Sequence, residues 1–292
     1  MNIGFHTNAY VWAGLNDLEQ IADLALEQRF TCLEIGPGIT LDQKVFERVG
    51  QRISYSAFIY CRNFIDDDEQ TAEEERRELW KRMEFAAVVG AKKMICSTGI
   101  SRELSLPDSG GCDPLKSKGR ALEFLHQAVE HAQELGLTLC LENCPMYRNI
   151  ATSPYMWEEI FSEFSPEELG LCYDPSHFVW QMIDVYEPLE RFADRIYHIH
   201  LKDTLLMREK LAQVGILHNT AKERGFEKNQ WWRHTLIGEG EINWKRFLDG
   251  VKKLPSPLLD VSFEQEDCNY EGEPEKVSRG MGLQRQRLEL LM

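Results

Sequence analysis

Four short segments of the chain end in residues that can bind a metal ion. They read Leu-Glu-Asn at 141–143, Tyr-Asp-Pro-Ser-His at 173–177, His-Ile-His-Leu-Lys-Asp at 198–203 and Ser-Phe-Glu at 262–264. Each closes or follows an apolar run that predicts a β-strand. If these strands lie parallel and side by side, three carboxylates and one imidazole converge, from Glu142, Asp174, His200 and Glu264. A mixed oxygen and nitrogen set of this kind suits a divalent ion such as Mn²⁺.

Each of these residues, taken alone, has an ordinary explanation, because a glutamate at a strand end is usually solvated or paired with a cation. Four coincidences on four consecutive strands require a common explanation. An acidic cluster without a cation would repel itself, and a divalent ion relieves that repulsion. We therefore predict a metal site. For two further residues, His6 and Glu34, pocket lining and barrel packing stay open as alternatives.

The elements that would position these residues alternate along the whole chain. Short apolar runs are each followed by a longer amphipathic stretch, which is typical of repeated βα units and a parallel sheet. We expect strands at about 3–7, 31–35, 53–59, 92–97, 137–142, 169–173, 196–201 and 258–264. We expect helices at about 17–28, 40–51, 70–89, 114–135, 153–164, 185–193, 243–253 and 272–290.

Eight such units predict an α/β fold of the (β/α)₈ TIM barrel type, in which active sites lie at the carboxyl ends of the strands. The four candidate segments fall at the ends of strands five to eight, on that face. Barrels of this kind reach the length of this chain as one domain, so we expect a single domain over residues 1–292.

Composition excludes several partners. The chain has 48 acidic and 33 basic residues and a net charge of -15, which would repel a phosphate backbone. No apolar run has the length of a membrane span, and the N-terminus lacks the pattern of a secretory signal. Cysteines lie within or beside the predicted strands, where we expect buried thiols and not disulfides: Cys32, Cys96, Cys140 and Cys172. We predict a soluble cytoplasmic protein that binds neither nucleic acid nor membrane.

The motifs, in this order, resemble those of a known family. The segments at 141–143, 174–177, 198–203 and the run Gly-Glu-Gly-Glu-Ile-Asn-Trp at 238–244 look like the sugar (phosphate) isomerase/epimerase group of the xylose isomerase-like TIM barrels. The resemblance covers essentially the whole chain. It implies a divalent ion, commonly Mn²⁺ with Mg²⁺, Co²⁺ or Zn²⁺ as alternatives, held by Glu142, Asp174, His200 and Glu264.

The resemblance also implies a chemistry. In ketose epimerases of this group the two metal-bound glutamates move the proton, so Glu142 and Glu264 become the catalytic candidates, and His177 would reach a substrate oxygen. The ion would chelate a carbonyl and the neighbouring hydroxyl, stabilising the enediolate that forms when the adjacent carbon is deprotonated. The expected substrate is a small carbohydrate.

One position departs from the ketose 3-epimerases, which carry an arginine six residues after the metal histidine. This chain has Leu206 there, and its strand continues into Lys202 and Asp203, as in the broader isomerase/epimerase and inosose-processing branches. Lys202 either binds a substrate oxygen or pairs with a nearby carboxylate.

A connection of about 40 residues, 203–242, separates the seventh strand from its helix, and connections of that length are usually functional or disordered. Its aromatic residues predict an ordered cover over the barrel mouth. Aromatic faces stack on sugar rings, so Trp232 and Arg233 are candidate substrate contacts. Trp12, shortly after the first strand, is a third candidate substrate contact, by analogy with aromatic residues at that place in relatives. The alternative is that these large side chains pack the connection onto the barrel.

These observations leave several functions open. The first is an isomerase or epimerase acting on a keto sugar or keto polyol. The second is a lyase with the same site, either an inosose-type dehydratase or the barrel subunit of a C-glycoside-deglycosylating enzyme acting on 3-keto glycosides. A nuclease like the related abasic-site endonucleases is disfavoured by the acidic charge. A non-catalytic sugar-binding barrel, a homo-oligomer and a required second subunit also stay open.

Overall fold

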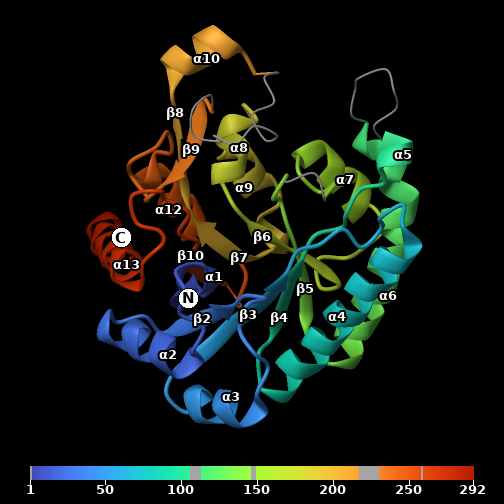
Figure 1. Cartoon of the computed structure of the whole chain (residues 1–292). Coiled ribbons are helices and arrows are strands. Elements are labelled where there is room, and N and C mark those ends of the chain that lie inside the picture. Colours follow the sequence, from blue (N-terminus) through green and yellow to red (C-terminus); the bar gives the residue numbers. More distant parts are fainter. Residues whose placement is uncertain (1, 106–112, 146–148, 217–229, 258) are drawn as a thin grey trace.

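A closed barrel of parallel strands forms the centre of the molecule (Figure 1). The computed structural model describes residues 2–105, 113–145, 149–216, 230–257 and 259–292. Around the barrel the described strands follow the order β1-β10-β7-β6-β5-β4-β3-β2. They are β1 (Ile3–His6), β2 (Cys32–Ile35), β3 (Ser54–Tyr60), β4 (Lys93–Cys96), β5 (Thr138–Glu142), β6 (Leu169–Tyr173), β7 (Ile196–Leu201) and β10 (Asp260–Phe263). The predicted TIM barrel is confirmed, and β6 and β7 have the predicted bounds.

Helices between the strands cover the outside of the barrel (Figure 1). The eight that correspond to predicted helices are α2 (Leu18–Glu27), α3 (Gln43–Gly50), α4 (Glu69–Val88), α6 (Lys118–Glu134), α7 (Pro154–Phe161), α9 (Glu187–Arg191), α12 (Trp244–Val251) and α13 (Pro274–Leu291). Local chemistry sets their ends: the Asp17 side chain accepts from the first free N–H groups of α2, and Gly136, with φ +67°, turns the chain from α6 into β5.

Several shorter elements were not predicted, and most lie in the connections that follow strand ends. They are α1 (Asn8–Trp12), α5 (Arg102–Ser105), η1 (Pro114–Ser117), α8 (Ser176–Trp180), η2 (Ala193–Arg195), β8 (Asp203–Leu206), α10 (Arg208–Val214) and β9 (Trp232–Thr235). β8 and β9 pair antiparallel, Asp203 opposite Thr235 and Leu206 opposite Trp232. The predicted long loop is therefore partly a two-stranded ribbon, which rises from the barrel with α10 in Figure 1. Residues 217–229 of that connection lie outside the described residues.

Side-chain alternation determines which strand residues point into the barrel. A small buried cluster from neighbouring strands, separate from the main core, includes Ala57, Ile95, Cys140 and Cys172. Glu142 lies two residues beyond Cys140 and so shares its face of β5. Cys32, Cys96, Cys140 and Cys172 are buried free thiols, as predicted. Among the described residues, none of the helices has the length and apolar composition that crossing a membrane requires.

Candidate metal centre

The four predicted ligands come together at the carboxyl end of the barrel. One donor atom from each of Glu142, Asp174, His200 and Glu264 can be chosen so that all lie within 4.8 Å of one another. The Nδ1 atom of His200 lies 3.1 Å from Glu142 Oε1, 3.2 Å from Glu264 Oε2 and 3.9 Å from Asp174 Oδ2. The ends of β5, β6, β7 and β10 thus present three carboxylates and one imidazole to one point.

The donor set fits a divalent ion. Asp174 is held by its neighbours: its backbone N–H donates to Asn143 Oδ1 at 2.8 Å, and its own Oδ1 accepts from the Ser176 N–H at 2.8 Å. Its other oxygen, Oδ2, is buried and, within the described part of the chain, has an ion-pair contact with Lys202 Nζ at 3.1 Å but accepts no well-aligned hydrogen bond. Burial, offset in part by Lys202, raises the pKa of Asp174 to about 6. A divalent ion beside Oδ2 would favour the charged carboxylate.

Glu34 lies behind His200 and fixes its orientation. The Nε2 atom of His200 is 3.0 Å from Glu34 Oε1, while Nε2 of His198 is 2.8 Å from Glu34 Oε2. Burial alone would raise the pKa of Glu34, but the two histidines hold it well below its usual range. Burial would lower the pKa of His200, but its neighbours, the Glu34 and Glu264 carboxylates among them, raise it well above its usual value. A divalent ion would take the place of the proton on Nδ1, while Nε2–H donates to Glu34, the arrangement usual for metal-binding histidines. The sequence alone left Glu34 open between pocket lining and barrel packing. The structure shows that Glu34 contacts His200 on the side away from the cluster and so holds its ring in place.

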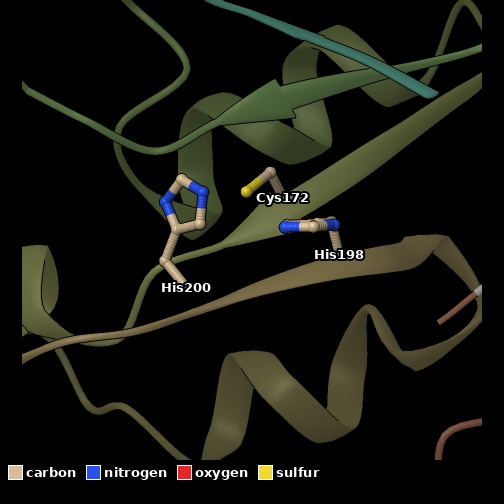
Figure 2. A group of neighbouring side chains, drawn as sticks. All are labelled: Cys172, His198 and His200. Carbon is tan, nitrogen blue, oxygen red and sulfur yellow. The ribbon is translucent and has the colours of Figure 1, made fainter. Parts of the chain in front are cut away.

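His200 also belongs to a second group of residues whose types can bind a metal ion. Cys172, His198 and His200 offer donor atoms within 4.8 Å of one another, and all three are buried. Figure 2 shows the thiol of Cys172 directed toward the ring of His200, with His198 beside it. Burial raises the pKa of Cys172 well above its ordinary value, so this sulfur stays a neutral thiol. The group shares His200 with the carboxylate cluster and packs beneath it.

Lys202 is a buried cation among the carboxylates. Its ammonium lies 2.5 Å from Glu264 Oε2, 3.1 Å from Asp174 Oδ2 and 3.3 Å from Glu266 Oε2. Burial would lower its pKa, but the surrounding carboxylates, Asp174 first, raise it well above its usual value. The structure thus shows the predicted pairing of Lys202 with carboxylates, and contact with a substrate oxygen stays a prediction.

Glu266 was not predicted. Burial, offset in part by Lys202 and strengthened by the charge of Glu264, raises its pKa to about 7. Its position could have suggested it, because Glu266 lies two residues after the predicted ligand Glu264, in the segment that leaves β10 at the carboxyl end.

Two histidines lie beside the cluster: His177, which was predicted to reach a substrate oxygen, and His6, which the sequence left open between pocket lining and packing. His177 Nε2 lies 3.4 Å from both Asp174 Oδ2 and Lys202 Nζ, and His6 Nδ1 lies 3.5 Å from Glu264 Oε1. The ring of His6 stacks on that of His200. Burial and the nearby Lys202 ammonium hold the pKa of His177 well below its usual value, so its ring is neutral and can accept or donate a hydrogen bond.

A cavity of about 560 Å³ opens onto the cluster. Its lining includes six of the predicted site residues: His6, Trp12, Glu142, His177, Lys202 and Glu264. Residues that the sequence did not single out also line it, among them Asn8, Cys61, Arg62, Ser97, Arg102, Cys144, Asn149 and Glu266. Cys61 donates its thiol hydrogen to Glu142 Oε2 at 3.2 Å. A volume of this size is in the range of small-molecule sites.

Contrary to the prediction, Trp232 and Arg233 are not in the described lining of this cavity. The ring of Trp232 stacks flat on Trp180 of α8, with centroids 4.7 Å apart and an interplanar angle of 1°. Arg233 Nη1 donates to Cys268 Sγ at 3.4 Å. The packing alternative describes Trp232, because its flat face is covered by another indole.

Asp203 organises the return of the chain toward β10. Its Oδ2 accepts from Gly238 N at 3.0 Å, from Gly240 N at 3.1 Å and from Trp244 Nε1 at 2.7 Å. A Cβ atom on Gly240 would approach Asp203 Oδ1 to 2.3 Å, so only glycine fits there. Asp203 therefore binds the glycines of the 238–244 motif. These bonds hold the end of the 203–242 connection beside the site.

Residues 17–287 match the family model described as xylose isomerase-like TIM barrel. The chain belongs to this family. Two relatives resemble the chain by sequence. The uncharacterized protein YfiH of Bacillus subtilis strain 168 is 25% identical over 215 residues, which are 66% of this chain and 65% of that protein. The chain thus matches just under two thirds of that relative's length. An inosose dehydratase of Clostridium perfringens is 25% identical over 273 residues, 88% of this chain and 80% of the enzyme.

Two solved structures are similar over nearly the whole chain. The crystal structure of the IOLI protein with a bound zinc atom has a TM-score of 0.69 at 17% identity, covering 100% of this chain and 96% of that one. The structure of an L-ribulose 3-epimerase has a TM-score of 0.69 at 15% identity, covering 99% and 94%. At these identities the two structures show a shared fold.

Proposed function

We propose that this protein is a metal-dependent isomerase or epimerase that moves a proton at the carbon next to the carbonyl of a keto sugar or keto polyol. The observation that carries the proposal is the convergence of Glu142, Asp174, His200 and Glu264 within 4.8 Å, at the cavity floor. The zinc atom in the IOLI structure and the sugar chemistry named for the epimerase support the same reading.

The four converging residues would hold the ion, for which we propose Mn²⁺ first and Mg²⁺, Co²⁺ or Zn²⁺ as alternatives. When bound, such an ion supplies positive charge that stabilises the negative charge developing on the carbonyl oxygen as the proton leaves. Lys202 and neutral His177, which also line the cavity, would bind the remaining substrate oxygens.

Glu142 and Glu264 would move the proton. In the barrel order, β7 and β6 separate β10 from β5, so the two carboxylates approach the cluster from opposite sides. Although burial would raise the pKa of Glu264, Lys202 and His200 hold it well below its usual value, which keeps this group ionised and able to accept a proton. Glu142, which accepts the Cys61 thiol hydrogen, faces the other side of the substrate carbon and would return a proton there.

A second candidate is a lyase that uses the same first step. The relative from Clostridium perfringens, an inosose dehydratase, favours it, because dehydration begins with proton removal beside a carbonyl. Glu266 lines the cavity with a pKa near 7, so it can carry a proton to a departing hydroxyl group. A barrel subunit that cleaves 3-keto glycosides would require the same donor.

Solvent-deuterium incorporation tests both candidates. Mn²⁺-loaded protein in D₂O would be incubated with a panel of ketoses, inososes and 3-keto glycosides and followed by NMR. Exchange with conversion to an epimer or isomer supports the isomerase, whereas exchange with loss of water or an aglycone assigns the lyase. An absence of exchange across the panel, with bound metal verified, contradicts the proposal.

A further inference from the structure

We propose that the substrate carries an anionic group, a carboxylate or a phosphate, which Arg62 and Arg102 bind in the cavity that holds the carboxylate cluster. The inference rests on the proposed function, since it names the substrate class of the same cavity. It departs from the neutral sugar or polyol that the motifs alone indicate.

The two arginines reach the cavity from neighbouring parts of the barrel. Arg62 lies two residues beyond the end of β3, and Arg102 begins α5 in the connection after β4. Both belong to the lining that also contains Glu142 and Glu264. One small molecule in this cavity could therefore contact both the cluster, which lies at the ends of β5, β6, β7 and β10, and the guanidinium groups, which follow β3 and β4.

Hydrogen bonds tie the two arginine-bearing segments together. Ser97 Oγ donates to the Arg62 carbonyl at 2.6 Å. Asn63 bridges the same segments through both of its amide atoms, accepting from Ile100 N at 2.8 Å and donating to Ile100 O at 2.9 Å. The two arginines are thus carried by cross-linked backbone, the preorganisation that a binding site requires.

A second anchor fixes the start of α5. Asp67 Oδ2 accepts from the backbone N–H of Arg102 at 2.8 Å and of Glu103 at 3.1 Å. Asp67 Oδ1 also accepts from Ser101 Oγ at 2.5 Å. The Asp67 carboxylate binds the backbone of Arg102, so this contact does not occupy the Arg102 side chain.

Both guanidinium groups keep capacity for an anion. Arg62 donates from Nη1 to the Cys61 carbonyl at 2.7 Å and lies over the Tyr60 ring, while its nearest carboxylate, on Glu75, is 3.9 Å away. Within the described residues, the Arg102 side chain forms no ion pair. A guanidinium group offers five N–H donors in a planar fork that matches carboxylate and phosphate oxygens.

The charge of the cavity favours the same conclusion. Four carboxylates act on the Lys202 ammonium, from Glu142, Asp174, Glu264 and Glu266, and Lys202 is the one lysine in the described lining of the cavity. Even with one divalent ion, the carboxylates of this centre outnumber its cations, so the centre by itself would repel an anionic substrate. The two arginines add positive charge to the part of the lining that follows β3 and β4, in a chain whose net charge is -15. They would therefore admit and orient an anionic molecule where the rest of the protein repels it.

Isothermal titration of the Mn²⁺-loaded protein with three probes tests this inference. The probes are quinate, a cyclic polyol carboxylate; myo-inositol 1-phosphate; and neutral myo-inositol. We expect at least one anionic probe to bind roughly tenfold or more tightly than myo-inositol, and this preference to shrink at high salt. Whichever anion binds more tightly identifies the group as carboxylate or phosphate.

The double variant Arg62→Gln and Arg102→Gln should lose the preference. Arg77→Gln, the same change at an exposed position on α4 outside the cavity lining, should keep it. Equal affinity for the three probes, absence of binding by all of them, or a preference that survives in the double variant overturns the inference. The last outcome would mean that the anion binds the metal directly.

The two proposals fail separately. Probe binding requires no turnover, so a preference that depends on the arginines, together with no deuterium exchange on any substrate, contradicts the proposed function alone. Exchange on a neutral ketose together with no anion preference contradicts the present inference alone.

Discussion

Two lysines are buried at opposite ends of the same barrel, and their surroundings differ. At the amino end, Lys93 Nζ lies 2.5 Å from Asp260 Oδ2 and 3.1 Å from the Tyr197 carbonyl. The other oxygen of Asp260 accepts from Asn2 Nδ2 at 2.8 Å. At the carboxyl end, Lys202 lies within 3.3 Å of carboxylate oxygens from three residues: Asp174, Glu264 and Glu266.

The difference separates a structural ion pair from a functional one. At the amino end the paired side chains balance each other, as expected where a barrel is built for stability. At the carboxyl end, one ammonium faces more negative charge than it neutralises, and Glu142 adds to that charge. The surplus leaves room for a further cation, which is the electrostatic signature of a metal site.

The largest expected effect comes from neutralising one of the carboxylates at the carboxyl end of the barrel. Glu142→Gln or Glu264→Gln should lower turnover by roughly 10²–10⁴-fold, the usual contribution of a general acid or base. Both should also weaken metal binding, because an amide is a neutral ligand. Steady-state kinetics and metal titration measure the two effects. Glu47→Gln, exposed on α3, is the matched control. Full activity in either site variant would refute the proton-transfer assignment.

Replacing each lysine by methionine tests the comparison directly. Lys93→Met leaves Asp260 without its buried partner and should cost about 3–5 kcal/mol of unfolding free energy, with no rescue by metal. Lys202→Met leaves three carboxylates to repel one another, and added Mn²⁺ should then raise the Tm more than it does in the wild type, because the ion replaces the lost charge.

Thermal unfolding with and without Mn²⁺ measures this contrast. The proposed difference between the two ends of the barrel is wrong if Mn²⁺ stabilises both lysine variants and the wild type by the same amount.

Glu34→Gln should have a smaller effect, on metal affinity. The amide can accept a hydrogen bond through only one oxygen, so it cannot hold His198 and His200 as the carboxylate does. Loss of such a supporting contact commonly lowers metal affinity by roughly 10–100-fold. Ser262→Ala is the control, because Ser262 Oγ contacts His198 at 3.0 Å without holding His200. Unchanged metal affinity in a folded Glu34→Gln variant would show that Glu34 does not support metal binding.

The sequence was sufficient for the barrel and for the convergence of four ligands, because both follow from local patterns. Alternating βα units specify the fold, and a polar residue at the end of each of four strands specifies the rim. Glu34 was harder to interpret, since β2 lies far from β7 in the barrel order and its contact with His200 crosses the barrel interior. Only the closed fold brings such residues together.

Other residues depended on tertiary partners that have no sequence signal. Trp232 has the character of a sugar-binding aromatic, yet its face is covered by Trp180, 52 positions earlier in the chain. Arg62 and Arg102 lie in connections whose course depends on bonds from Ser97, Asn63 and Asp67. A connection is placed by its contacts more than by periodicity, so its functional residues escape pattern analysis.

The smallest expected effects separate the two tryptophans that were predicted to contact the substrate. Trp232→Ala should lower the unfolding free energy by at least roughly 0.5–1.5 kcal/mol, the worth of an aromatic pair beyond its buried area, and leave KM unchanged. Trp12→Ala should instead raise KM and leave the unfolding free energy nearly unchanged. Trp12 lines the cavity with 59% of its surface exposed, so it has little packing to lose and a substrate contact to remove.

Measuring Tm and KM for both variants makes each the control of the other. A raised KM with unchanged Tm in Trp232→Ala would restore this residue as a cover of the cavity and would require residues of the 203–242 connection to move toward it. A lowered Tm with unchanged KM in Trp12→Ala would make that indole a packing residue. The crossed result is expected because a stacked face is unavailable to a sugar, whereas an exposed face on a cavity wall is available.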